Sequence, residues 1–188
     1  MENTLKGQSL ETRYKLANAL KELMRHEALE KISVKQIVSK AGLTRQTFYR
    51  NFLDKYDLVN WYFEELVKKS FKQMGVKLTL REGLIEKFGF IKAERAFFSQ
   101  AFLYEKSNSL IEYDYQCIYQ FYYNIIAAKN AEALDKETVF LLKMYCKGSI
   151  DMTVDWVANG MSDDIEATVD LLIEAMPKRL ENLLKDLR

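Results

Sequence analysis

Residues 33–56, SVKQIVSKAGLTRQTFYRNFLDKY, constrain the fold of this chain more than any other stretch. They predict two short helices joined by a tight turn. Ser33 and Gln36, three residues apart, form a capping box that satisfies backbone N–H groups at the start of the first helix. Gly42 predicts its end, because glycine adopts a left-handed conformation there at no steric cost. Thr44 then caps the second helix, and the pair has the form of a helix-turn-helix.

The same residues carry a family resemblance. The run AGLTRQTFYRNFLDKYDLV resembles the DNA-binding signature of the TetR/AcrR transcriptional regulators, with an aromatic residue before Tyr49, then Phe52, then Lys55. The resemblance covers about residues 8–66, and RQTFY with DKYDLVNW is similar to a subgroup near the dihydroxyacetone-kinase operon regulators. Beyond it, the resemblance rests on the helical layout and on residues 148–156.

The composition is that of a folded helical protein. Of 188 residues, 48% are hydrophobic and 29% charged, with one proline and seven glycines. So few helix breakers favour long helices over a β-sandwich. We expect no signal peptide and no membrane association, since no apolar run is long enough to span a bilayer. Cys117 and Cys146 show no disulfide spacing, which favours a reduced, cytoplasmic setting.

The expected architecture is all-α, with about nine helices in two domains. A three-helix DNA-binding domain with the helix-turn-helix is expected at residues 1–53, and a helical ligand-binding and dimerisation domain at 54–188. Residues 1–60 hold 11 Lys and Arg against 7 Asp and Glu, so the basic excess lies in the half with the motif. Phosphate contact requires positive charge there.

Helix boundaries follow from apolar periodicity and capping residues. The first helix is expected at about 9–26, and a long helix at about 54–74. The other expected signals are a stop at Gly75, a turn at residues 107–109, an Asp135 cap on a helix running to Gly160, an Asp163–Glu166 cap on the last helix, and a kink at Pro177.

Under the family resemblance, the second motif helix reads DNA. Arg45 and Gln46 lie on its first turn, where side chains reach base edges in the major groove. Arginine can bond guanine O6 and N7, and glutamine adenine N6 and N7, each with two hydrogen bonds. Contacts to phosphates position the protein; the residues expected there are Ser33, Lys35, Thr44, Thr47, Tyr49, Asn51 and Lys55. Arg50 contacts either a phosphate or only solvent.

The last two predicted helices are apolar around most of their circumference, over residues 139–157 and 165–187. Such helices must be buried on more than one side, and in a chain this small the second side is a further copy of the chain. The resemblance implies a homodimer through a four-helix bundle of these helices. The residues expected at this interface are Gly148, Met152, Trp156, Val169, Leu172 and Met176.

Ten of the 24 aromatic residues lie between Phe97 and Tyr123. Aromatic residues at helical spacing are more often core than pocket, but tyrosines also suit small organic ligands. The resemblance implies that such a ligand binds inside the C-terminal domain. The residues expected to contact it are Trp61, Phe98, Phe102, Tyr115, Tyr119, Tyr122 and Met144.

Catalysis and metal binding have little support in the sequence. His26 is the single histidine, and its place near a helix end favours a capping role. The sequence shows no nucleophile–base pairing, no CxxC and no glycine-rich phosphate loop. We therefore expect no catalytic residue, no metal, no cofactor and no enzyme.

The prediction is a ligand-responsive transcriptional regulator that binds a palindromic double-stranded DNA operator as a homodimer. Repression is the commonest role in the family, and the subgroup resemblance keeps activation open. Two alternatives remain at this point: a DNA-binding factor that acts through a protein partner, and an interaction module with a vestigial motif.

Overall fold

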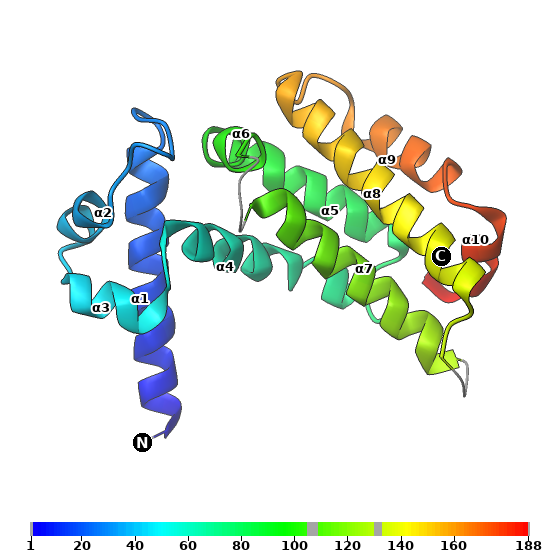
Figure 1. Cartoon of the computed structure of the whole chain (residues 1–188), viewed down its shortest axis with the longest axis horizontal. Coiled ribbons are helices and arrows are strands. Elements are labelled where there is room, and N and C mark those ends of the chain that lie inside the picture. The colour runs from blue at the N-terminus through cyan, green and yellow to red at the C-terminus, as the bar shows by residue number, and fades with distance from the viewer. Residues whose placement is uncertain (1, 105–108, 130–132, 188) are drawn as a thin grey trace. The chain divides into compact units, whose positions relative to one another are not determined.

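The computed structural model describes residues 2–104, 109–129 and 133–187, and its regular elements are helices (Figure 1). The all-α prediction is confirmed. The elements are α1 (Glu2–Leu23), α2 (Val34–Ala41), α3 (Arg45–Asn51), α4 (Lys55–Val67), the 3-10 turn η1 (Phe71–Gln73), α5 (Leu80–Ala93), α6 (Arg95–Phe102), α7 (Leu110–Lys129), α8 (Lys136–Ala158), α9 (Ile165–Glu174), α10 (Lys178–Leu183) and the 3-10 turn η2 (Lys185–Leu187). The predicted turn at 107–109 lies largely outside the described residues.

The chain divides into two compact units. The first comprises residues 1–65 and 94–110, and the second residues 66–93 and 111–188. Most of α4 and all of α6 therefore pack with the helix-turn-helix. The predicted functional boundary at residues 53 and 54 lies inside this first unit.

The helix-turn-helix forms through the local bonds that the sequence predicts. Ser33 Oγ accepts from the Gln36 backbone N–H at 3.3 Å, and the Ser33 N–H donates to Gln36 Oε1 at 2.8 Å. Gly42 ends α2 with a φ of 66°, in the left-handed region. Thr44 Oγ1 caps α3 by accepting from the Thr47 N–H at 3.1 Å.

The short helices α2 and α3 pack against α1. Leu16 and Leu20 of α1, Ile37 of α2 and Phe48 of α3 are completely buried. Each contributes about 1.5–3 kcal/mol from removal of apolar surface from water. This shared core holds the outer face of α3 in a defined orientation on α1.

Helix α6 is tied to the segment that joins α1 to α2. Gln100 Oε1 accepts from the Leu29 N–H at 2.7 Å, and Gln100 Nε2 donates to the Met24 carbonyl at 2.5 Å. Glu94, just before α6, forms an ion pair with Lys21 of α1. These polar contacts explain why α6 belongs to the first unit although it follows α5 in the chain.

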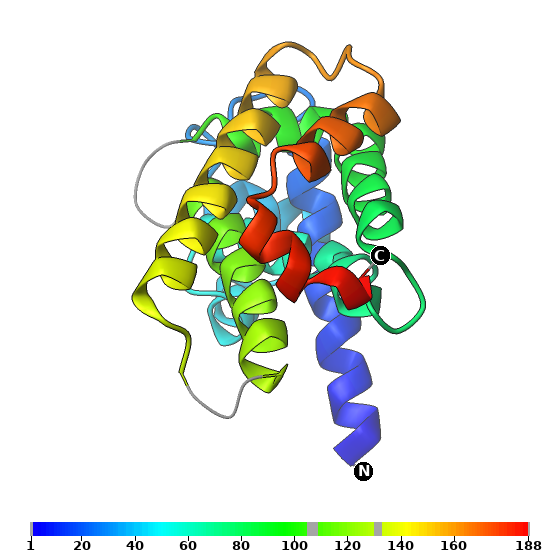
Figure 2. The same cartoon turned by 90° about the vertical axis from the view of Figure 1, so that its right-hand side faces the viewer.

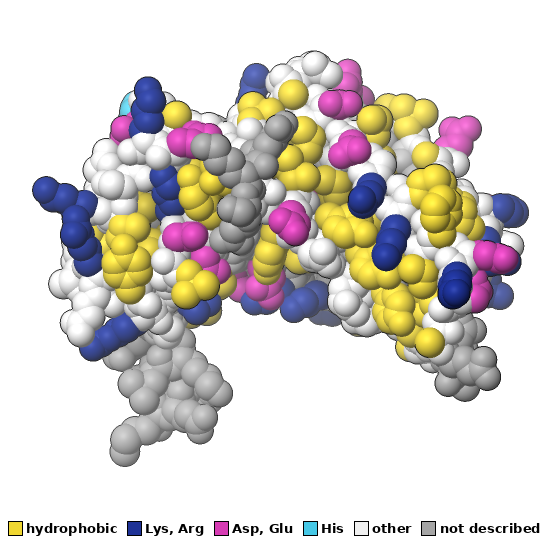
Figure 3. All heavy atoms as spheres, viewed as in Figure 1, with side chains coloured by type: hydrophobic (Ala, Val, Ile, Leu, Met, Phe, Trp, Pro, Cys, Tyr) yellow, Lys and Arg dark blue, Asp and Glu magenta, His cyan; other side chains and the backbone are white. Residues whose placement is uncertain are grey.

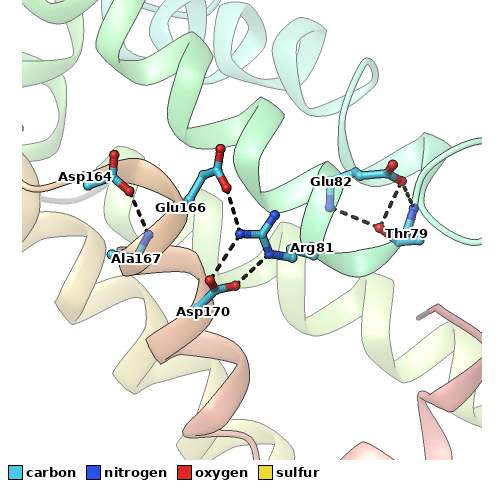
Figure 4. Close-up of polar contacts among 7 residues, drawn as sticks. All are labelled: Thr79, Arg81, Glu82, Asp164, Glu166, Ala167 and Asp170. Atoms are coloured by element: carbon cyan, nitrogen blue, oxygen red, sulfur yellow. Dashed lines mark hydrogen bonds and ion pairs between the residues drawn. The ribbon is translucent and has the colours of Figure 1, made fainter.

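In the second unit, Arg81 of α5 binds two acidic residues of α9 (Figure 4). Its Nε donates to Asp170 Oδ1 at 2.7 Å, and its Nη2 donates to Glu166 Oε2 at 3.0 Å. These three side chains are exposed to solvent, so water and salt screen their attraction and its net contribution to stability is small. Thr79 and Glu82 form a capping box at the start of α5.

Helix α8 joins α9 through both its core and its end (Figure 2). The Tyr145 hydroxyl donates to the Leu172 carbonyl at 2.9 Å, and Trp156 Nε1 donates to the Asp163 carbonyl at 3.3 Å. The Trp156 ring also packs edge-on against Phe88 of α5, with centroids 4.9 Å apart. Aromatic side chains thus connect three helices of this unit.

Two predicted boundaries differ from the structure, and the predicted interruption at Pro177 is present. Helix α4 ends at Val67 rather than near residue 74, and Gly75, with a φ of 75°, lies in the turn that follows η1 instead. The kink predicted at Pro177 takes the form of a break between α9 and α10, since proline lacks the N–H that a continuous helix needs. The N-cap of α9 is Asp164, which accepts from the Ala167 N–H, and not Asp163.

Among residues 2–104, 109–129 and 133–187, no helix combines the length and the hydropathy needed to span a bilayer. Within the same ranges, no three His, Cys, Asp or Glu side chains are grouped as metal ligands.

Candidate nucleic-acid interface and effector site

The outer face of α3 exposes the residues predicted to read DNA. Arg45, Gln46 and Arg50 are exposed, and Tyr49 has 59% of its surface accessible. Phe48, on the opposite side, is fully buried and meets the Tyr49 ring edge-on at 5.5 Å. Lys and Arg side chains gather over α2 and α3, at the left edge of Figure 3. This face presents hydrogen-bond donors and positive charge together, as contact with DNA requires.

Several predicted phosphate contacts also have roles within the protein. Thr44 and Thr47 are bonded to each other through their hydroxyls at 2.9 Å. Asn51 Nδ2 donates to the Thr47 carbonyl at 2.8 Å, and the Asn51 carbonyl accepts from Arg13 Nη2 at 3.2 Å. Ser33 Oγ is engaged with Gln36 at 2.6 Å. Their contacts with phosphates stay predictions, as do those of Tyr49, Arg50 and the exposed Lys35.

The contacts of Lys55 differ from the phosphate contact that the sequence predicted. Its ammonium donates to the carbonyls of Leu29, Glu30 and Ile32, each at 2.7 Å. An ammonium has three N–H donors, so in this conformation none is left for a phosphate. Burial lowers the pKa of Lys55, while Glu30 and other carboxylates oppose this shift. The structure therefore assigns Lys55 to holding the α1–α2 segment, and the sequence pattern alone could not show this.

Replacing Lys55 by methionine should lower the free energy of unfolding by about 1–3 kcal/mol, because three carbonyls lose a charged donor. Thermal or urea denaturation checks this. Lys35→Met is the matched control, since Lys35 is exposed on α2; it should leave stability unchanged. If Lys55→Met keeps full stability and instead lowers the salt dependence of DNA binding, the phosphate contact is correct.

The predicted ligand residues do not form one pocket. Trp61 packs between Tyr14 and Phe52, with ring centroids 5.2 and 5.6 Å away, in the core of the first unit. Phe98 and Phe102 are fully buried in that same core. A purely aromatic pattern could not distinguish this core from a pocket.

The second unit contains a cavity of about 20 Å³. It is lined by Phe71, Leu84, Lys87, Phe88, Ile118, Tyr122, Tyr145, Ser149, Thr153 and Leu172. Tyr122 is the one predicted ligand residue that lines it. Tyr115 and Tyr119 are half-buried on α7, with rings 5.9 Å apart, and Met144 is 51% exposed on α8.

Sequence reasoning missed a buried ion pair that reaches the wall of this cavity through Lys87. Lys87 is 95% buried and forms a 2.5 Å ion pair with the fully buried Asp114. Each interrupts an apolar helix face: Lys87 follows Leu84 and precedes Ile91 on α5, and Asp114 precedes Ile118 on α7 by one turn. Two residues of opposite charge, each on an otherwise apolar helix face, were the signal in the sequence that could have predicted this buried pair.

The predicted dimerisation residues fall into two groups. Trp156, Val169, Leu172 and Met176 are buried within the second unit and belong to its own core. Met152 and Gly148 are exposed on α8, and a Cβ added at Gly148 would meet no atom within 4 Å. An apolar periodicity marks a helix for burial, but it does not separate the side that faces its own core from the side that faces a partner.

Comparisons with known proteins agree with this architecture. Residues 16–61 match the model of the bacterial regulatory proteins of the tetR family, and residues 79–178 match the model of a transcriptional regulator C-terminal region of the same family. A stretch of 56 residues is 41% identical to the HTH-type dhaKLM operon transcriptional activator DhaS of Lactococcus lactis subsp. lactis (strain IL1403). That stretch spans 30% of this chain and 30% of that relative.

Solved structures show the same fold along nearly the whole chain. The dihydroxyacetone kinase operon activator DhaS superposes with a TM-score of 0.62 at 20% identity, over 93% of this chain and 96% of that one. A TetR transcriptional regulator from Streptococcus agalactiae 2603V gives a TM-score of 0.66 at 17% identity, over 95% and 100%.

The family models match both the motif and the larger helical region, and they agree with a helix-turn-helix whose reading face is exposed. Regulators of this kind bind DNA and are not enzymes, which confirms the prediction of no catalytic activity. The chain belongs to the TetR family of bacterial DNA-binding transcriptional regulators.

Proposed function

We propose that this regulator represses its target genes by occupying a palindromic operator as a homodimer in the cytoplasm, and that a small organic molecule releases it. The observation that carries the proposal is the exposed reading face of α3, with Arg45, Gln46, Tyr49 and Arg50. A helix that presents Arg and Gln on its first turn matches the donor and acceptor pattern of base edges in the major groove.

The dimer is supported by an exposed apolar surface on α8 and α9. Phe140, Met144 and Met152 follow one another on α8, and Leu171 lies on α9; at least half of each side chain is accessible. We call these four residues, with Gly148, the α8–α9 face. Figure 3 shows hydrophobic side chains interspersed with basic ones over α8. Exposed apolar patches of this kind mark interaction sites, and a twofold dimer would pair the face with itself.

The dimer gives a physical route from ligand to DNA. A twofold pair of reading helices engages two half-sites whose centres lie about 34–36 Å apart, one turn of DNA. A ligand that binds more tightly to the dimer at one spacing of its two reading helices shifts the population toward that spacing. A ligand with equal affinity for both spacings changes nothing.

Activation is the second proposal. The Lactococcus relative, 41% identical over 56 residues, is named an operon transcriptional activator. The same DNA-binding domain can promote transcription instead of blocking it, since the direction of regulation depends on where the operator lies relative to the promoter. The exposed face of α3 is compatible with both repression and activation.

Genomic footprinting with the purified protein tests the proposal. We expect protected sites with palindromic half-sites about one DNA turn apart, and binding that weakens steeply as salt rises. Deleting the gene should raise transcription at these sites if the protein represses, and lower it if the protein activates. Protection without any palindrome, or affinity independent of salt, would rule out the proposed mode of DNA binding.

A further inference from the structure

Arg13 of α1 contacts the C-terminal end of the reading helix α3. Its Nη2 donates to the Asn51 carbonyl at 3.2 Å, and Asn51 is the last residue of α3. The last carbonyls of a helix have no partner within it, and they carry partial negative charge that attracts a cation. The Arg13 guanidinium therefore satisfies a group that α3 by itself leaves open.

Two aromatic rings that follow α3 in the chain hold the guanidinium in place. Arg13 Cζ lies 5.2 Å from the centroid of the Phe52 ring and 5.6 Å from that of Trp61, and both rings are buried. A planar guanidinium can lie against aromatic rings and donate a hydrogen bond at the same time. Its Nε, however, is buried and has no hydrogen-bond partner among the described residues. A buried donor without an acceptor lowers stability, so stability alone does not explain an arginine here.

Asn51 links this contact to the first turn of α3. Its Nδ2 donates to the Thr47 carbonyl at 2.8 Å, and the Thr47 N–H donates to Thr44 Oγ1 at 3.1 Å. Thr44 is the cap that directly precedes Arg45. Helix α3 has only seven residues, and so short a helix is not stable by itself. Its direction therefore depends on contacts with neighbouring helices, and Arg13 provides such a contact at the last turn.

We propose that Arg13 is a positioning residue for operator recognition. By holding the last carbonyl of α3 against α1, it sets the angle at which the first turn of α3, and Arg45 in particular, approaches the base edges. This inference rests on the proposed function, because it requires that α3 reads the bases. Hydrogen bonds to base edges weaken steeply when they are misaligned, whereas the attraction between a basic side chain and a phosphate depends mainly on distance. A change in the angle of α3 should therefore reduce sequence discrimination more than non-specific affinity.

The test compares the full-length wild type with Arg13→Met, which keeps an apolar side chain of similar length but removes the charge and the donors. Two duplexes serve as probes: the operator selected from a randomised library, and a scrambled duplex of the same length and composition. Arg13→Met should bind the operator about tenfold more weakly, as when a bidentate base contact is lost. Its affinity for the scrambled duplex should stay close to that of the wild type.

Lys15→Met is the matched control, because it removes the same charge from the same helix at an exposed position. Lys15 pairs with Glu11 within α1 at 2.8 Å, and both side chains are mostly exposed. We expect this variant to bind both duplexes like the wild type. Thermal denaturation of each variant sets a temperature at which all of them are folded during the titrations.

A double variant tests whether Arg13 acts through Arg45. Two residues that act through one contact show non-additive effects, so Arg13→Met should reduce discrimination less in an Arg45→Ala background than in the wild type. Arg13→Lys keeps the charge and a donor for the Asn51 carbonyl, but not the planar fork that also lies over the rings. It should recover part of the discrimination that Arg13→Met loses. If Arg13→Met does not fold, Arg13→Lys carries both comparisons, with a smaller loss of discrimination expected.

Three results would overturn the inference. Wild-type discrimination together with a lowered melting temperature would make Arg13 purely structural. An equal loss of affinity for both duplexes, with a salt dependence lower by about one charge per DNA-binding domain, would make Arg13 a phosphate contact. Fully additive losses in the double variant would show that Arg13 does not act through Arg45.

The wild type separates this inference from the proposed function. If it binds the operator and the scrambled duplex equally, the proposed function fails and the inference fails with it. If it discriminates between them and both Arg13 variants discriminate as well, the inference alone is wrong and the proposed DNA reading stands.

Discussion

Replacing Met144 by lysine is expected to turn the protein into a monomer that no longer holds its operator. Met144 lies in the middle of the α8–α9 face, between Phe140 and Met152, and half of its side chain is exposed. In the proposed dimer, a lysine there would bury a charge in the apolar contact between the two copies. A monomer has only one DNA-binding domain and loses the avidity of binding two half-sites at once. This loss lowers the affinity by a factor of about 10²–10⁴.

Light scattering at micromolar concentration and operator titration measure the two effects. Val76→Lys is the matched control, because Val76 is 77% exposed and lies between η1 and α5, outside helices α8 and α9. It should remain a dimer with unchanged affinity. A wild type that is monomeric at micromolar concentration would contradict both the dimer and the spacing mechanism.

Replacing Arg45 by alanine is expected to relax base preference at one position of each half-site. The base expected at that position is a guanine. Arg45 is exposed on the first turn of α3, from which a guanidinium reaches O6 and N7 of guanine with two hydrogen bonds. Loss of such a contact costs about 1–3 kcal/mol of discrimination. Gln46→Ala should act at a neighbouring position. If the operator is palindromic as proposed, each loss should appear in both halves.

Selection from a randomised operator library measures this change directly. Arg50→Ala is the matched control, since Arg50 is exposed on the last turn of the same helix. It should weaken binding to all sequences alike and lower the salt dependence by about one charge per head. Unchanged preferences for both Arg45→Ala and Gln46→Ala would show that the protein reads its operator through other side chains or through DNA shape.

The local features of the fold were predictable because their causes are local. The Ser33–Gln36 capping box, the left-handed Gly42 and the Thr44 and Asp135 caps each depend on a few neighbouring residues. The cap on α9 was wrong by one residue, since two adjacent aspartates offer the same chemistry and only the packed backbone selects Asp164.

The placement of the candidate site was less predictable. Phe98 and Phe102 have the same residue type and spacing as a pocket wall, yet they pack against Phe63 of α4 within the first unit, at centroid distances of 6.1 and 6.2 Å. Lys87 in the wall of the cavity pairs with Asp114, which lies 27 residues away in the chain. No local pattern reports that two such residues meet.

The sequence by itself determined the helix-turn-helix, the helical class and the family, because capping, glycine conformation and apolar periodicity act within one or two turns. Only the tertiary structure decided which apolar residues face the core and which remain exposed on α8 and α9, and that Lys55 binds three carbonyls of the α1–α2 segment. The physical reason is that burial and long-range pairing depend on which helices meet, and a helix carries the same periodicity whichever partner covers it.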